Sequence, residues 1–252
     1  MTGSTDRLWN RAQSYLAAGQ TAPARATLES LLARDATNIH AHLILGGIAW
    51  REDRMRDSVR HALDAARIVT DEGADLVAVI AALIQIGECA MARECLKRPV
   101  FAQTKNSELL VQAAALQQML GDHPTSLQLF ERARAAGMDG LEFRFDLATQ
   151  LSFNGRLKEA EAELEYCASK ETTIGRVYVE LARLRRQTPE SNHLQLLDRQ
   201  IARAVPGSMD HAGIEFARYK ELEDLGRHDE AWNALAKASR NPSCRRSSLA
   251  PS

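Results

Sequence analysis

Residues 141–167 read LEFRFDLATQLSFNGRLKEAEAELEYC, and this stretch decides the fold. Apolar residues recur at helical spacing on both sides of Asn154-Gly155, so each group lies on one face of a helix. Gly155 separates the two groups, because glycine adopts the left-handed backbone of a tight turn without steric cost. The stretch therefore predicts two helices joined by a turn at Gly155. Its apolar positions are Phe143, Leu147, Ala148 and Leu151 before the turn, and Ala160, Leu164 and Cys167 after it.

The turn at Gly155 belongs to a series that repeats every 34 residues. Residues that end helices or form turns occupy this series, and mostly small residues recur seven positions before and five positions after each of them. Small residues at both places permit close contact between two helices, and we interpret the exceptions, Ile80 and Leu194, as marks of looser repeats. The turn residues are Gly19, Asp53, Gly87, Gly121, Gly155 and Pro189; the small positions are Ala12, Gly46, Ala114, Ala148 and Ala182 before them, and Ala24, Ser58, Ala92, Ser126 and Ala160 after them.

A seventh turn, at Gly226, follows after three extra residues around Pro206-Gly207-Ser208. Neither helix of a pair can bury its apolar stripe alone, so neighbouring pairs must stack. We therefore expect an all-α, right-handed solenoid of about seven helix–turn–helix repeats, with helices of roughly 12 to 14 residues. The expected units are 5–38, 39–72, 73–106, 107–140, 141–174 and 175–208 (together 5–208), then 209–242, with disordered ends at 1–4 and 243–252.

Composition restricts the classes of function. The 252 residues include 32 Lys+Arg and 33 Asp+Glu, a net charge of −1, so the chain lacks the basic excess of a general nucleic-acid binder. No apolar run approaches the ~18 residues of a membrane-spanning helix, and residues 1–6 have no secretory-signal pattern. The four cysteines form no CxxC pair, which suits a reducing compartment. We expect a cytoplasmic protein that binds neither nucleic acid nor membrane.

Motifs for catalysis, cofactor binding or metal binding are absent from the sequence. It contains no GxxxxGK[ST], GxGxxG, GxSxG or HExxH. The seven histidines are scattered, and Cys89 and Cys95 do not have the spacing of a tetrahedral zinc site. Acidic residues such as Glu221 and Glu223 are expected on a charged helix surface beside Lys220. We expect no catalytic residue, no cofactor, no metal ligand and a buried structural role for each cysteine.

The register of the repeat resembles that of the tetratricopeptide repeat, whose pattern is W-x2-L-G-x2-Y, then A-x3-F, A and P. Leu45-Gly46 fill the L-G positions of repeat two, Tyr15 fills the Y position of repeat one, and Phe130 and Ala133 fill the F and A positions of repeat four. The leading Trp is replaced, so the resemblance depends on seven aligned units together. It implies a superhelix whose concave groove binds a protein or peptide.

In tetratricopeptide arrays the groove is lined chiefly by the second, fifth, ninth, twelfth and thirteenth positions of each repeat. Here the fifth positions are apolar and the ninth mostly small, so the resemblance implies capture of a helix or an extended peptide by aromatic and Met anchors. The alternative is that these residues are core between adjacent helices. Some members bind a terminal carboxylate through Lys and Asn, but the corresponding positions here hold no cation, so that activity is not expected. The candidate groove residues are Trp9, Leu43, Trp50, Val77, Ile84, Val111, Met119, Phe145 and Phe153.

Repeat six carries a cluster of arginines. Arg176, Arg183 and Arg186 are spaced seven and then three apart, which places them on one face of the predicted helix. One interpretation is a docking face for an anionic partner segment. The alternative is a solvated face whose arginines pair with Glu180 and Glu190.

Residues 211–240 are similar to the last repeat of bacterial proteins in which tetratricopeptide repeats precede a sulfotransferase domain. The strand and Gly-rich loop with which that domain binds 3′-phosphoadenylyl sulfate are absent from this sequence. The resemblance implies a bacterial protein and an alternative function, the regulatory portion of a truncated or split sulfotransferase. The matching residues are Phe216-Ala217-Arg218-Tyr219-Lys220, Glu223-Asp224, Gly226 and Asp229-Glu230-Ala231.

The last predicted helix carries Trp232, Leu235 and Ala238 on one side. A solenoid normally closes with a capping helix, and no periodic stretch follows residue 242. We therefore expect an uncapped apolar face that a partner covers, through which the chain self-associates, or that results from truncation of a longer gene product. The leading interpretation of the whole sequence is a non-catalytic scaffold for protein–protein interaction.

Overall fold

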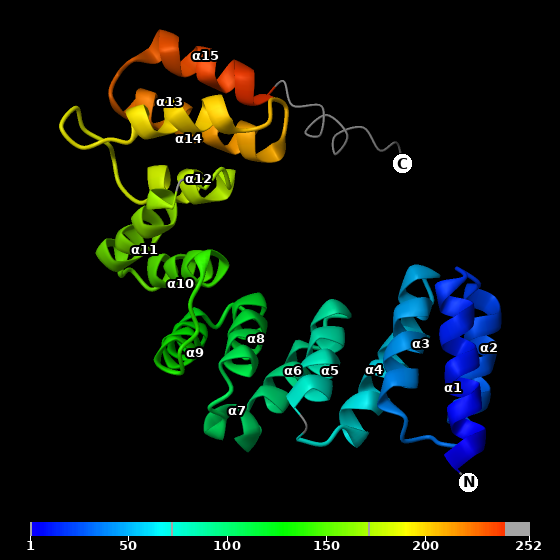
Figure 1. The fold of residues 1–252 in the computed structure, drawn as a ribbon. Helices are drawn as coiled ribbons and strands as arrows, with labels where there is room; N and C mark the ends of the chain where they lie inside the picture. The colour runs from blue at the N-terminus through cyan, green and yellow to red at the C-terminus, as the bar shows by residue number, and fades with distance from the viewer. Residues whose placement is uncertain (1, 72, 171, 240–252) are drawn as a thin grey trace. The chain divides into compact units, whose positions relative to one another are not determined.

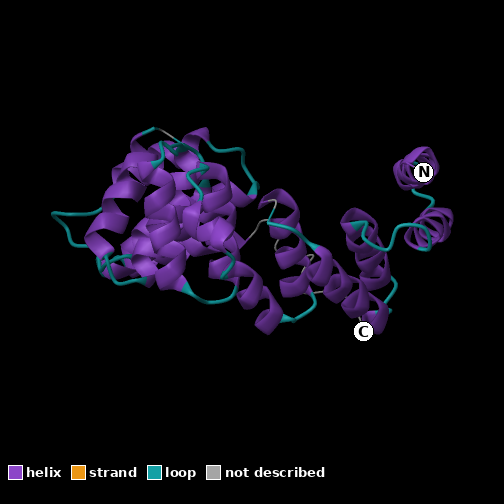
Figure 2. Cartoon of the chain, turned by 90° about the horizontal axis from the view of Figure 1, so that it is seen from below, coloured by secondary structure: helices purple, strands orange, loops and turns teal. Residues whose placement is uncertain are grey.

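The computed structural model describes residues 2–71, 73–170 and 172–239, which are mostly helical and contain no strand (Figures 1 and 2). This confirms the expected all-α class. The helices are α1 (Thr2–Ala17), α2 (Thr21–Leu32), α3 (Ile39–Arg51), α4 (Met55–Ile68), α5 (Gly73–Gln85), α6 (Cys89–Leu96), α7 (Pro99–Gln103), α8 (Ser107–Met119), α9 (His123–Ala135), α10 (Leu141–Phe153), α11 (Leu157–Ser169), α12 (Gly175–Arg183), α13 (Leu194–Arg203), α14 (Met209–Asp224) and α15 (His228–Ser239).

The chain divides into two compact units, residues 1–137 and residues 138–252. Unit 1 stacks the pairs α1/α2, α3/α4, α5/α6 and α8/α9, with contacts between α3 and α5 and between α5 and α8. Unit 2 holds the pairs α10/α11, α12/α13 and α14/α15, with α12 against α14. The first helices α3, α5 and α8 of unit 1 are thus neighbours, as are α12 and α14 of unit 2.

The turn inside each pair, apart from α12/α13, contains a left-handed residue. The turn predicted at Gly155 is confirmed, since its φ is +76°. In repeat two the same place is held by Asp53, which has a φ of +56° and is the one non-glycine residue with positive φ within the described residues. Aspartate tolerates this conformation better than most residues but less well than glycine.

The recurring positions on either side of the turn lie in the core. All twelve side chains, or the backbone in the case of Gly46, are buried. Where the second position is serine, its hydroxyl also joins the two helices: Ser58 Oγ donates to Gly46 O at 3.0 Å, and Ser126 Oγ donates to Ala114 O at 2.8 Å. The two units with a large residue at one of these places, repeats three and six, are the two that depart from the regular pair.

Repeat three does not have the single long second helix that the period predicts. Helix α6 ends at Leu96 and the short α7 begins at Pro99. Proline has no backbone N–H and disfavours helical backbone in the residue before it, so the break falls at Arg98. The Arg98 side chain turns back across the break and donates to Val69 O at 2.8 Å.

Repeat six has a short first helix and a long connection in place of a tight turn at Pro189. Helix α12 ends at Arg183, and residues 184–193 lead to α13 through an isolated bridge between Thr188 and Ser191. The expectation of helices of roughly 12 to 14 residues is wrong here. Helix α14 holds the connection, since Asp224 Oδ2 accepts a hydrogen bond from the Gln187 N–H at 3.1 Å.

Glu221 of α14 holds the end of the same connection. Its carboxylate accepts from His193 N at 2.7 Å and lies 2.8 Å from His193 Nδ1. The Glu221 side chain is buried, so the expectation that it sits on a charged helix surface is wrong. A charged group in this place is stabilised because both of its oxygens have a partner.

The first described residues of the chain are part of a helix. Helix α1 begins at Thr2, so residues 2–4, expected to be disordered, are helical, and Arg34 donates a hydrogen bond to Ser4 Oγ. The predicted tail 243–252 and the last three residues of the predicted unit 209–242 lie outside the described residues.

Candidate functional site

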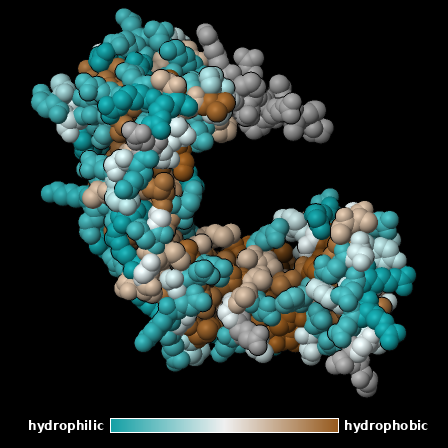
Figure 3. Space-filling model, viewed as in Figure 1, coloured by the Kyte–Doolittle hydropathy of each residue, from teal (hydrophilic) through white to brown (hydrophobic). Residues whose placement is uncertain are grey.

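The fifth positions of the four repeats in unit 1 lie on neighbouring first helices. Each of these side chains is half-buried, which is intermediate between a core residue and an exposed one. Trp9 packs in part against the core of α1 to α3, as the core alternative requires. Figure 3 shows hydrophobic residues gathered over this part of unit 1 between hydrophilic ones. The four residues are Trp9 (α1), Leu43 (α3), Val77 (α5) and Val111 (α8).

Further along the same helices lie the residues of the twelfth and thirteenth positions. Seven or eight residues separate them from the fifth positions, which is two helical turns and keeps them on the same side. Trp50 and Ile84 are half-buried, whereas 62% of Met119 is exposed. We call these three residues together with Trp9, Leu43, Val77 and Val111 the first-helix face of unit 1.

A small gap opens in this face between α3 and α5. Its volume is about 50 Å³, and it is bordered by Leu43, Gly47, Trp50 and Ala82. Gly47 leaves it open because glycine has no side chain, as the small ninth position predicts. The gap accommodates a methyl or methylene group rather than a whole ligand.

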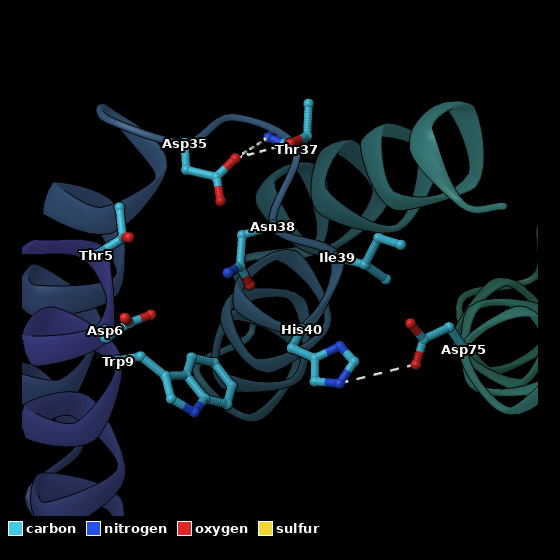
Figure 4. A pocket seen from close by; sticks show the side chains of 9 residues that line it. All are labelled: Thr5, Asp6, Trp9, Asp35, Thr37, Asn38, Ile39, His40 and Asp75. Atoms are coloured by element: carbon cyan, nitrogen blue, oxygen red, sulfur yellow. Dashed lines mark hydrogen bonds and ion pairs between the residues drawn. The ribbon is translucent and has the colours of Figure 1, made fainter. Parts of the chain in front are cut away.

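A larger cavity of about 520 Å³ lies at the N-terminal ends of α1, α3 and α5 (Figure 4). Trp9 connects it to the first-helix face. Polar side chains surround the rest of the space, and none of those that line it is Lys or Arg. We call it the Trp9 cavity. The polar lining consists of Thr5, Asp6, Asp35, Thr37, Asn38, His40 and Asp75.

Hydrogen bonds hold the loop that forms one wall of the Trp9 cavity. Asp35 Oδ1 accepts from the Thr37 N–H at 3.0 Å and from Thr37 Oγ1 at 2.7 Å. Asn38 caps α3, its Oδ1 accepting from Ala41 N at 2.9 Å. The cavity therefore has a wall fixed before any ligand arrives, which reduces the entropy lost on binding.

The opposite wall is built from side chains of three helices. The Trp9 and His40 rings meet edge to face with their centroids 5.9 Å apart. His40 Nε2 lies 3.7 Å from Asp75 Oδ1, which ties α3 to α5. This cavity is not predictable from the sequence, because its residues have no motif spacing and come together only when the pairs stack.

In unit 2, the two remaining candidates differ in their surroundings. Phe145 packs against the core of the unit, and the Arg176 guanidinium lies over its ring, 4.5 Å from the ring centroid. Phe153, at the end of α10, is 62% exposed. The structure thus brings seven of the nine predicted groove residues together in unit 1 and two in unit 2.

Solved structures with the same arrangement of helices are tetratricopeptide repeat proteins. No protein-family profile and no curated protein matches the sequence. A tetratricopeptide repeat protein from Parabacteroides merdae matches with a TM-score of 0.63 at 15% identity, over 95% of this chain and 94% of that one. The C-terminal part of a TPR repeat-containing protein from Cytophaga hutchinsonii matches with a TM-score of 0.64 at 13% identity, over 95% and 98%. Pseudomonas aeruginosa pilF matches with a TM-score of 0.56 at 16% identity, over 83% and 96%.

This chain has the tetratricopeptide-repeat fold. At such low identities the likeness shows the fold alone, and function must be argued from the surfaces of this chain. The first helices of tetratricopeptide repeats are the ones that carry the candidate residues described above.

The arginines of repeat six do not form the predicted helix face. Helix α12 ends at Arg183, so Arg186 lies in the connection that follows and shares no helix with Arg176. Arg176 pairs with Glu142, and Arg183 Nη1 lies 3.5 Å from Glu180 Oε1. These pairs resemble the solvated, partnered alternative more than an open anion site, although Glu142 rather than Glu190 is the partner of Arg176.

The three residues of the predicted C-terminal face differ in exposure. Trp232 on α15 is 70% exposed, Leu235 is half-buried, and Ala238 is buried. Only Trp232 therefore offers a large apolar surface to solvent.

Several chemical features bear on what the site can do. Within the described residues, no three His, Cys, Asp or Glu side chains converge closely enough to hold one metal ion. No described helix has an apolar stretch long enough to cross a bilayer. Burial raises the pKa of the Cys95 and Cys167 thiols, so both are protonated and weakly nucleophilic at neutral pH. Cys244 lies outside the described residues.

Proposed function

We propose that this chain is a non-catalytic scaffold whose first-helix face in unit 1 binds a segment of a partner protein. The observation that carries the proposal is the row of half-buried apolar side chains on α1, α3, α5 and α8, which ends in the exposed Met119. A core residue would be covered completely, and a solvated face would be polar. A row that is apolar and still accessible is typical of surfaces that bind an apolar helix or peptide.

The size of this face sets the affinity to expect. Burying its exposed parts would contribute about 25 cal/mol for each Å² of apolar surface, against the entropy lost on association. We expect a dissociation constant of the order of 1 μM, which corresponds to a binding free energy of about −8 kcal/mol. We expect a partner that binds reversibly, without cofactor or metal, in the cytoplasm, where the free thiols of Cys89, Cys95 and Cys167 remain reduced.

The test is a selection of binding peptides from a random displayed library on the full chain. We expect peptides with apolar residues at helical or alternating spacing. Their affinity should fall about tenfold or more in Leu43→Glu and Val77→Glu, because each change places a charge where an apolar anchor docks.

The matched controls are Ala26→Glu and Ala90→Glu, each of which adds the same charge at an exposed position of a second helix, α2 or α6. These variants should bind like the wild type. If the selected peptides bind Leu43→Glu and Val77→Glu as tightly as the wild type, the first-helix face is not the binding surface.

The second candidate, the regulatory portion of a sulfotransferase, depends on the resemblance within residues 216–231. In the structure several of these residues stabilise the repeat to which they belong. Ala217 and Ala231 are buried, Gly226 forms the left-handed turn, and Glu230 pairs with Arg227 at 2.7 Å. Since local packing accounts for the pattern, we favour the scaffold.

A further inference from the structure

The Trp9 cavity adds a polar end to the apolar first-helix face. With a volume of about 520 Å³, it has room for a long side chain of a partner. Its location at the N-terminal ends of α1, α3 and α5 means that a segment lying on the face can also reach into it. The chemistry of its lining decides which side chain it selects.

The charge in the cavity is negative. Asp6, Asp35 and Asp75 contribute three carboxylates, and no Lys or Arg lines the space. The N-terminal end of a helix carries about half a positive charge, so three helix ends offset only part of this. Asp6 has no ion-pair partner among the described residues, and it is exposed to the cavity side of α1 (Figure 4).

A bare metal ion does not fit this arrangement. The acidic groups of the cavity are too far apart to coordinate one ion together, as the absence of any metal-binding cluster among the described residues shows. An organic cation, which is attracted by separate carboxylates without coordinating them, suits this lining better. A guanidinium has five N–H donors in one plane, whereas an ammonium is a compact point charge.

The aromatic side of the cavity favours the same ligand. Trp9 is half-buried and held edge to face against His40, so its ring is positioned before binding. An indole face attracts organic cations through its ring quadrupole, and guanidinium groups also stack on it.

We propose that the Trp9 cavity binds an arginine side chain of the partner segment, with the guanidinium on the Trp9 ring and attracted by the negative charges of Asp6 and Asp75. As a statement about the partner, this rests on the proposed function. The cavity itself can be tested without any peptide, so the two can fail separately.

The test uses the full chain labelled with 5-fluorotryptophan and observed by 19F NMR. The three signals, from Trp9, Trp50 and Trp232, are assigned with Trp→Phe variants. N-acetyl-arginine amide should shift the Trp9 signal and saturate, and should leave the signal of Trp232 in place. N-acetyl-citrulline amide has nearly the same shape but no charge, and should cause no comparable shift.

The charge dependence is tested with Asp6→Asn/Asp75→Asn, which should weaken the response of Trp9 to N-acetyl-arginine amide about tenfold. Glu29→Gln/Glu94→Gln removes the same charge at exposed positions outside the cavity and should respond like the wild type. The proposal is wrong if Trp9 does not respond, if citrulline acts like arginine, or if both double variants behave alike.

The results also separate this proposal from the proposed function. A Trp9 response without any peptide bound to the first-helix face would support the cation site and reject the scaffold function as stated. Selected peptides that bind the face, but whose affinity is unchanged by Arg→citrulline or by Asp6→Asn/Asp75→Asn, would reject the arginine site alone.

Discussion

Two glycines on first helices differ in what a methyl group would meet. A Cβ at Gly175 would lie 2.4 Å from the Asp210 carbonyl oxygen and 2.9 Å from its Cα, so the clash is with backbone that cannot rotate away. A Cβ at Gly46 would meet only ordinary contacts, the nearest being His61 Cβ at 3.5 Å. The close approach of α12 to α14 therefore depends on glycine at position 175. At position 46, the glycine of the repeat signature, the structure has room for a methyl group.

We predict that Gly175→Ala lowers the free energy of unfolding by about 2 kcal/mol or more. Gly46→Ala should leave it unchanged or raise it by up to about 1 kcal/mol, because alanine favours helix. Urea denaturation followed by circular dichroism measures both. Equal midpoints for the two variants would mean that α12 and α14 are not in backbone contact.

A pair of histidines gives unit 1 a dependence on pH. His42 Nε2 lies 3.2 Å from Ala36 O and His42 Nδ1 lies 3.1 Å from His61 Nδ1, so His61 donates to an unprotonated His42 nitrogen. Burial first, and then the neighbouring His42 and Arg60, lower the pKa of His61 to about 4. The folded protein therefore keeps His61 neutral at a pH where the unfolded chain is protonated.

The stability that follows is complete above pH 6.5, the ordinary pKa of histidine, and is lost as the pH falls to about 4. We predict a loss of about 1 to 2 kcal/mol over this range after allowing for the partial exposure of the ring. His61→Asn keeps a donor but does not titrate, so its stability should fall less between pH 7 and pH 5. Parallel pH profiles for the two proteins would contradict this assignment.

At the scale of the helix pair, the turn residue limits stability. Asp53 and Gly155 hold the same place in their repeats, with φ of +56° and +76°. Left-handed backbone costs a residue with a side chain about 1 to 2 kcal/mol relative to glycine. We predict that Asp53→Gly raises the free energy of unfolding, measured by urea denaturation, and that Gly155→Val lowers it by more than ~1 kcal/mol. A Gly155→Val variant as stable as the wild type would show that the strain is absent.

The regular pairs are predictable because each depends on local signals: an apolar stripe, a turn residue and small contact positions. The prediction for repeat six was wrong for a reason that lies outside the sequence of that repeat. Pro189 stands in the turn register, but Asp224 and Glu221, from the next repeat, hold the connection open. The predicted face of Arg176, Arg183 and Arg186 failed with it, because that face required a helix longer than the one that forms.

Considering the whole molecule, the apolar part of the site was predictable and the polar part was not. Leu43, Val77 and Val111 repeat at a fixed period and therefore mark a face in advance. Asp6, Asp35 and Asp75 share no motif and become neighbours of one cavity only when the pairs α1/α2, α3/α4 and α5/α6 stack. A site whose residues meet only when helix pairs stack can be recognised from the structure but not from the sequence.

Trp232 decides whether the chain associates with itself. It is 70% exposed on α15, more than any other aromatic side chain of the described residues, and an exposed indole favours contact with a second apolar surface. If copies associate through it, the mass measured by light scattering after size exclusion should rise with protein concentration, and Trp232→Glu should abolish the rise. Leu235→Glu is a poorer test, since Leu235 is half-buried and the change would also disturb α15.

The control is Val205→Glu, a charge placed on another exposed apolar residue of unit 2, which is 72% exposed. It should associate like the wild type, because a contact through α15 does not involve it. A monomeric wild type over the accessible concentrations, or a rise in mass that survives Trp232→Glu, would assign Trp232 to another partner or to none. A monomer would also leave the first-helix face of unit 1 as the surface on which the scaffold function depends.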